Sequence, residues 1–74
     1  MEIKSVSNRE ATIGMPIDEV RFLADAVNET LNAVSARDFK TRTGVTRERA
    51  DGIRLQLVDI MKAIVTHEKG AGQS

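Results

Sequence analysis

The sequence has no cysteine, no tryptophan and no tyrosine, and it holds a single histidine among its 74 residues. The lack of cysteine excludes disulfide bonds and thiolate metal sites. His67 cannot form a metal site alone, and its position near the end of a predicted helix favours a solvated or capping imidazole. With Phe22 and Phe39 as the only aromatic residues, base stacking and aromatic ligand cages are not expected. We therefore predict that the protein binds no metal and no cofactor.

Long apolar runs are also missing, since no run approaches the roughly 20 residues that span a bilayer. Residues 1–10 contain no apolar segment of the kind found in secretory signals. These absences predict a cytoplasmic protein that makes no membrane contact. The sequence also has no nucleophile elbow, no phosphate-binding loop and no paired cysteines. We therefore predict that it is not an enzyme.

A chain of this length forms one small domain, which we place at residues 1–69. Residues 70–74 read Gly-Ala-Gly-Gln-Ser, a composition that predicts a flexible tail. A domain this small buries only about 60% of its unfolded surface, so its core is thin. Association with a second copy is a common way to stabilise such a chain.

Charge is balanced overall but unevenly distributed along the chain. Eleven basic and eleven acidic side chains give a net charge of zero. Residues 1–36 hold three basic and six acidic groups, whereas residues 37–54 hold six basic and three acidic groups. This asymmetry predicts a basic region that contacts an acidic partner or the acidic half of a second copy. The candidate partner- or anion-binding residues are Arg42, Arg47, Arg49 and Arg54.

The N-terminal residues predict an antiparallel β-hairpin, with strands at residues 1–7 and 11–15. A three-residue loop, Asn8-Arg9-Glu10, would place Ser7 opposite Ala11. In that register the apolar residues Met1, Ile3, Ala11, Ile13 and Met15 share one face. An isolated hairpin is marginal in water, so we expect this face to pack on helices or the hairpin to pair with a second sheet edge.

Three helices are predicted after the hairpin. The first begins at Pro16, which suits the first helical position. A short helix at residues 36–43 follows a Ser35 cap and ends at Gly44 with left-handed φ. Thr46 then caps a long helix over residues 47–68, in which Gly52 is either tolerated or approached by another backbone.

The long helix carries two lines of apolar residues at helical spacing. We name as the first stripe Ala50, Ile53, Leu57, Ile60 and Ile64. We name as the second stripe Leu55, Val58, Met61 and Val65. We expect the first stripe to form the core with the first helix and the hairpin. The second stripe is surplus to so small a core, so it is the candidate dimer interface.

These elements predict an α+β fold: an N-terminal hairpin, a helix, a short helix and a long C-terminal helix. The predicted core comprises Ile3, Ile13, Val20, Leu23, Val27, Leu31, Phe39, Ile53, Leu57, Ile60 and Ile64.

Residues 39–50, Phe-Lys-Thr-Arg-Thr-Gly-Val-Thr-Arg-Glu-Arg-Ala, resemble the turn of helix-turn-helix DNA-binding domains. In that family the second helix lies in the major groove. The resemblance implies that Thr46, Arg47 and Arg49 face the groove, and that Lys40 and Arg42 lie near phosphates. The alternative interpretation is an ordinary corner between two helices with a solvated basic rim.

A wider resemblance covers residues 11–13, 16–20, 23–29 and 39–48. These segments look like a group of short bacterial proteins of unassigned role, which share a strand-rich start, an N-E-x-L helix end and a G-x-[ST]-R-E entry to the last helix. The resemblance supports the order of elements and implies no activity.

The function that the sequence favours is a small binding module that acts by protein–protein contact as an adaptor, an inhibitor or an immunity-type protein. We expect it to be a homodimer through the long helix, with a protein partner whose identity the sequence does not give. A dimeric DNA-binding regulator is the alternative. An inhibitor that captures an anionic small ligand through the same arginines is a further alternative.

Overall fold

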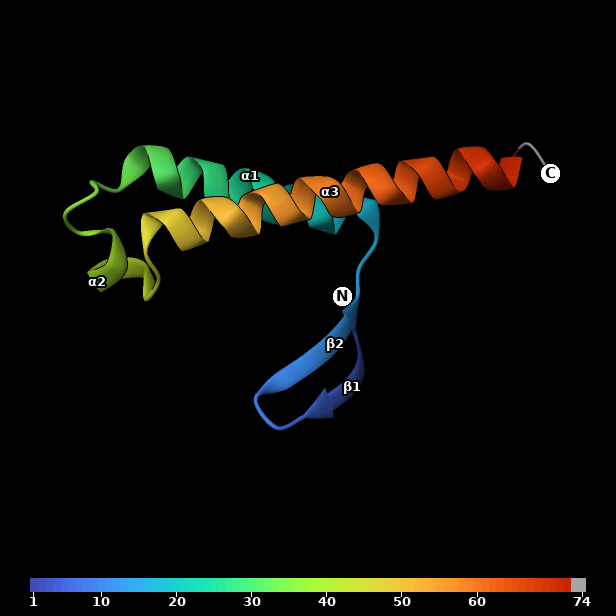
Figure 1. The fold of residues 1–74 in the computed structure, drawn as a ribbon, viewed down its shortest axis with the longest axis horizontal. Coiled ribbons are helices and arrows are strands. Elements are labelled where there is room, and N and C mark those ends of the chain that lie inside the picture. The colour runs from blue at the N-terminus through green and yellow to red at the C-terminus, as the bar shows by residue number, and fades with distance from the viewer. Residues whose placement is uncertain (73–74) are drawn as a thin grey trace.

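The computed structural model describes residues 1–72 and has the predicted α+β architecture. Its elements are β1 (Glu2–Ser7), β2 (Glu10–Gly14), α1 (Ile17–Ala33), α2 (Phe39–Thr43) and α3 (Arg47–Gly72). The helices α1 and α3 lie side by side, and the hairpin projects to one side of them (Figure 1). No helix within residues 1–72 is long and apolar enough to cross a membrane.

The molecule is extended for its length. Its principal axes measure 50 × 30 × 16 Å, and its radius of gyration is 14.9 Å. A compact domain of this length has a radius of gyration of about 11 Å. The chain exposes 6016 Å² of surface, whereas a compact monomer of its mass exposes about 4,500 Å². The fold therefore leaves a large area open to solvent.

The register of the hairpin differs from the prediction. Ser7 pairs with Glu10, so the loop is the two-residue Asn8-Arg9, and Arg9 adopts a left-handed φ of 65°. The pairing shifts between Ile3 and Ser5, as in a β-bulge. The prediction was wrong because it compared only unbulged registers, in which a two-residue loop divides the apolar residues between both faces.

The bulge gathers the apolar residues of the hairpin on one face. Val6 pairs with Ala11, and Ile3 pairs with Ile13. Because Ala11 and Ile13 are two positions apart on β2, they share a face, and their partners lie beside them. We call Ile3, Val6, Ala11 and Ile13 the hairpin face.

The hairpin face does not belong to the core, contrary to the prediction for Ile3 and Ile13. Ile3 is 69% exposed, Val6 is 72% exposed and Ile13 is 43% exposed. The cause is the short connection to α1, where Pro16 adopts φ −69° and ψ 161° and keeps the chain extended. This connection directs the hairpin away from its own helices (Figure 1). An ion pair between the Met1 amino group and Glu19 ties the hairpin to α1.

The buried core lies where α1, α2 and α3 meet. Its buried apolar residues are Val20, Ala24, Phe39 and Ala50. Small side chains on α1 and α3 allow the two helices to approach closely, and the Phe39 ring fills the space beside them. The core is therefore confined to the three helices.

Two predicted core residues of α3 are more exposed than expected. Ile53 is 37% exposed and Ile60 is 45% exposed, so these two residues of the first stripe do not belong to the core. The half-buried members of the predicted core are Leu23, Val27, Leu31, Leu57 and Ile64. The buried or half-buried residues of the first stripe, Ala50, Leu57 and Ile64, instead alternate along α3 with half-buried Arg47, Arg54 and Met61, so the helix is rotated from the predicted face. The apolar pattern could not show this rotation, since it depends on the contacts that Arg47 makes with α1.

Two of the predicted caps are confirmed. The Arg49 amide donates to Thr46 Oγ1 at 3.1 Å, which caps α3. Gly44 has φ 85°, and its amide donates to the Lys40 carbonyl at 2.8 Å. The predicted Ser35 cap is wrong: Ser35 Oγ accepts from the Asp38 amide at 3.3 Å, but residues 36–38 form a turn, and α2 begins at Phe39 with Asp38 at its N-cap.

Helix α3 runs further than predicted. It continues to Gly72, past the expected end near Glu68. The first part of the predicted tail, residues 70–72, is therefore helical, and residues 73–74 lie outside the described residues.

Candidate interaction surfaces

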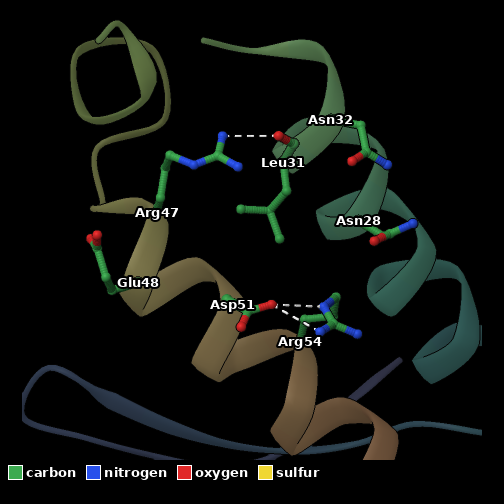
Figure 2. Close-up of a pocket in the computed structure, with 7 residues that line it drawn as sticks. All are labelled: Asn28, Leu31, Asn32, Arg47, Glu48, Asp51 and Arg54. Carbon is green, nitrogen blue, oxygen red and sulfur yellow. Dashed lines mark hydrogen bonds and ion pairs between the residues drawn. The ribbon is translucent and has the colours of Figure 1, made fainter. Parts of the chain in front are cut away.

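A shallow polar groove lies between α1 and the N-terminal half of α3 (Figure 2). Its volume is about 390 Å³. The residues that line it are Asn28, Leu31, Asn32, Arg47, Glu48, Asp51 and Arg54. The two asparagines come from α1, while the charged side chains come from α3. The groove thus presents amide and charged groups from two helices.

Arg47 spans the end of the polar groove and reaches the C-terminus of α1. Its Nη1 donates to the Leu31 carbonyl at 2.9 Å and to the Val34 carbonyl at 3.1 Å. Helix α1 has no basic residue in its last turn. The last carbonyls of a helix lack intrahelical partners and carry partial negative charge, so they favour a cation. Arg47 supplies that cation from α3.

The remaining arginines do not gather at one point. Arg54 donates through Nε to Asp51 Oδ1 at 3.0 Å, and its Nη2 lies 2.9 Å from the same oxygen. Arg42 is exposed on α2. Arg49 is exposed on another face of α3, where it lies beside Gly52. Arg47 and Arg54 therefore share the polar groove, while Arg42 and Arg49 lie apart from it.

An apolar groove of about 260 Å³ opens where α1, α2 and α3 meet. Its lining residues are Leu23, Ala26, Val27, Thr30, Phe39, Thr43 and Ala50. The first stripe continues this apolar surface along α3, because positions three or four residues apart share a helix face. We call Ile53, Leu57, Ile60 and Ile64 the open flank. With two of its isoleucines 37% and 45% exposed, the open flank is not closed by the rest of the chain.

The candidate dimer residues of the second stripe fall into two groups. Val58, Met61 and Val65 line a groove of about 500 Å³ with Ile17 of α1. In this groove Val58 and Met61 are half-buried, and Val65 is 37% exposed. The remaining residue, Leu55, is 50% exposed and does not line the groove. The second stripe therefore lies partly against α1.

Further exposed apolar groups lie outside the predicted sites. The hairpin face is one of them, and Phe22 of α1 is another, at 70% exposed. The sequence carried signals for both: Phe22 lies off the apolar stripe of α1, and the hairpin face follows once a bulge is allowed. Neither was predicted to be an interaction surface.

No group of three or more His, Cys, Asp or Glu residues that could hold a metal occurs within the described part of the chain. Comparison with protein-family models, with curated proteins and with solved structures found no match to this chain.

Proposed function

We propose that the protein is a small, non-enzymatic protein–protein binding module that works as a homodimer through α3. The observation that carries this proposal is the open flank. Ile53 and Ile60 are seven residues apart, as are Leu57 and Ile64, so the flank has the heptad spacing of a helix that packs on another helix. Ile53 and Ile60 remain 37% and 45% exposed in the single chain.

The exposed area supports the same proposal. The chain exposes 6016 Å², about 1,500 Å² more than a compact monomer of its mass. A standard interface buries about 800 Å² on each partner. The excess is therefore large enough to accommodate a stable dimer interface.

Pairing of two open flanks would give an isologous dimer, in which the same residues of both copies contact each other. Since each copy contributes α1 and α3, the product is a four-helix bundle. The apolar groove at Phe39 and Ala50 adjoins the open flank and would be covered in the same step. This arrangement completes a core that one chain leaves half open.

We place the dimer contact at the open flank because its exposed residues, Ile53 and Ile60, lie one heptad apart on a single line. Burial alone does not separate the two stripes, since each has two half-buried members, Leu57 and Ile64 in the open flank and Val58 and Met61 in the second stripe. Leu55 and Val65, which are exposed, are secondary candidates.

The polar surfaces are the proposed site for a different protein, as expected of an adaptor, an inhibitor or an immunity-type protein. Arg42 and Arg49 are exposed cations, and the polar groove adds amide and carboxylate groups. An acidic surface on the partner would complement the two exposed arginines. The helix-turn-helix alternative and the anion-capture alternative both draw on Arg47, whose Nη1 is already hydrogen-bonded to two carbonyls of its own chain. The geometry therefore favours protein contact over these alternatives.

Sedimentation equilibrium of Ile60→Glu tests the dimer. A carboxylate in the centre of the open flank would be desolvated by pairing, so we expect this variant to be monomeric where the unmodified chain is dimeric. Thr66→Glu is the matched control, because it places the same charge on an exposed position of α3 beside Val65. If Thr66→Glu dissociates the dimer and Ile60→Glu does not, the interface is the second stripe. A monomeric unmodified chain at all concentrations would refute the homodimer.

A further inference from the structure

We propose that a groove between α1 and the C-terminal half of α3 binds an acidic amphipathic helix of a different protein. The apolar residues that line this groove are Ile17, Val58, Met61 and Val65, and its charged lining residues are Arg21 and Lys62. We call it the basic-edged groove. Its occupation by a different protein rests on the proposed role as a binding module, but it does not depend on the homodimer.

The basic-edged groove has the form and the length to hold a helix. It runs between two helices that lie side by side (Figure 1), and its volume is about 500 Å³. Val58 and Val65 are seven residues apart, so they lie on one side of α3, about 10 Å apart along its axis. A groove between two packed helices accepts the side-chain ridge of a third helix. Two turns of a partner helix, with apolar anchors three or four residues apart, match this length.

Pairing of the open flanks leaves the basic-edged groove uncovered. Val58 follows Leu57 of the open flank, and Val65 follows Ile64. Successive residues of an α-helix are rotated by about 100° about its axis, so the groove and the open flank occupy different sides of α3. All residues that line the groove belong to α1 and α3. A second copy and a partner helix therefore use different surfaces of the chain.

The charges at the basic-edged groove favour an acidic partner. Arg21 belongs to α1 and Lys62 to α3, and both side chains are exposed. No carboxylate is among the lining residues, and neither cation forms an ion pair within residues 1–69. The acids three or four positions from them, Asp18, Asp25 and Asp59, are thus not paired with them. Carboxylates that flank the apolar face of a partner helix complement the two cations.

An acyl chain with a carboxylate shares this chemistry, but the groove is too open to favour it. Val65 is 37% exposed, and Thr66, which also lines the groove, is exposed. Sites for small molecules bury about 70–90% of the ligand surface. A helix lying in an open groove buries its apolar face and turns its polar face to water. The open form therefore favours a helix over a lipid.

Selection from a displayed library of 14-residue helices tests this site, with the full-length chain as bait. Apolar residues vary at positions of helical spacing, and Glu, Gln and Lys are equally represented at the flanking positions. We expect Glu to be enriched over Lys at the flanking positions, because Arg21 and Lys62 lie beside the apolar residues. Enrichment of Lys, or enrichment of no sequence, would overturn the inference.

Fluorescence anisotropy with a selected helix then locates the contact. Arg21→Glu combined with Lys62→Glu should raise the dissociation constant about tenfold or more, and the loss should shrink at high salt. Arg42→Glu combined with Arg49→Glu makes the same charge change at exposed cations outside the groove, so it should change the constant less than twofold. Since all four side chains are exposed, circular dichroism should show an unchanged helix content for both variants. Equal constants for the two variants would refute the site.

The apolar lining is tested separately. Val65→Glu places a carboxylate among the apolar residues, so it should also raise the dissociation constant about tenfold or more. An unchanged constant would show that the helix binds elsewhere. Saturable binding of decanoate that Val65→Glu abolishes, without enrichment of any helix, would assign the groove to an anionic lipid and overturn the inference.

Sedimentation equilibrium separates this site from the dimer. If Arg21→Glu combined with Lys62→Glu dissociates the homodimer, a second copy occupies the groove and the inference is overturned. If the unmodified chain is monomeric but binds the selected helix through Arg21 and Lys62, the homodimer falls and the site stands. If the helix does not depend on these cations while Ile60→Glu still dissociates the dimer, the site falls and the homodimer stands.

Discussion

The guanidinium carbon of Arg47 lies 5.4 Å from the centroid of the Phe39 ring. The same guanidinium group donates hydrogen bonds to the carbonyls of Leu31 and Val34. Since Phe39 belongs to α2 and Leu31 to α1, one side chain of α3 joins all three helices. This contact fixes the rotation of α3 against α1 and thereby decides which apolar residues of α3 remain exposed.

Arg47→Ala should destabilise the fold strongly. The substitution removes hydrogen bonds from a charged donor to two carbonyls and a cation–π contact with Phe39. We expect a loss of about 2–3 kcal/mol in the free energy of unfolding, measured by urea denaturation. Arg49→Ala is the control, since Arg49 is exposed, and it should change stability by less than about 0.5 kcal/mol. Equal effects of the two substitutions would contradict the role given to Arg47.

Gly44 and Gly52 should respond to substitution by alanine in opposite directions. Gly44 has φ 85°, so Gly44→Ala should cost about 1–2 kcal/mol of stability. Gly52 lies inside α3, and a Cβ there meets nothing within 4 Å, so Gly52→Ala should gain about 0.5–1 kcal/mol. Thermal denaturation of both variants measures these changes. A loss of stability in Gly52→Ala would indicate that a second chain approaches this position.

The thermal midpoint should depend on protein concentration if the chain is a homodimer. Dimerisation stabilises the folded state by mass action, so each tenfold rise in concentration should raise the midpoint by about 3–5 °C. Circular dichroism over a hundredfold concentration range measures the effect. In Ile60→Glu, which is expected to be monomeric, the midpoint should not vary with concentration. A constant midpoint in the unmodified chain would argue against association.

Binding to DNA should be undetectable at physiological salt. Of the basic residues implied by the helix-turn-helix resemblance, Arg47 is engaged with α1, which leaves Lys40, Arg42 and Arg49 exposed. So few free cations, in a chain of zero net charge, give little counterion release. Fluorescence anisotropy with labelled duplex DNA tests this expectation. Salt-dependent binding that Arg49→Ala weakens would instead support the DNA-binding alternative.

Local signals predicted the elements of this fold well. Thr46 and Gly44 mark helix ends through side-chain capping and a left-handed φ, which depend on a few neighbouring residues. The α+β order follows from these signals and from the change in hydrophobic period after Pro16. The register of the hairpin was not predicted, because a bulge is set by the whole pairing and not by the loop alone.

The candidate site was predicted only in part. The sequence located an apolar surplus on α3 and a basic region near its start, but it assigned the surplus to Leu55, Val58, Met61 and Val65. In the structure Val58 and Met61 are half-buried, as are Leu57 and Ile64 of the first stripe, so the exposed apolar residues come from both stripes: Ile53, Leu55, Ile60 and Val65. Either of two apolar lines on one helix can pack into the core, and which residues do so depends on the helix that packs against them.

The sequence by itself determined the order of strands and helices and the turn that ends α2 at Gly44 and starts α3 after Thr46, because propensity, capping and turn geometry act over a few residues. Only the tertiary structure decided which faces of those elements are buried and which are exposed. Arg47, which donates a hydrogen bond to the Val34 carbonyl at the C-terminus of α1, set the rotation of α3. The extended connection at Pro16 directed the hairpin away from the helices. Both depend on contacts or directions in space that no periodicity in the sequence records.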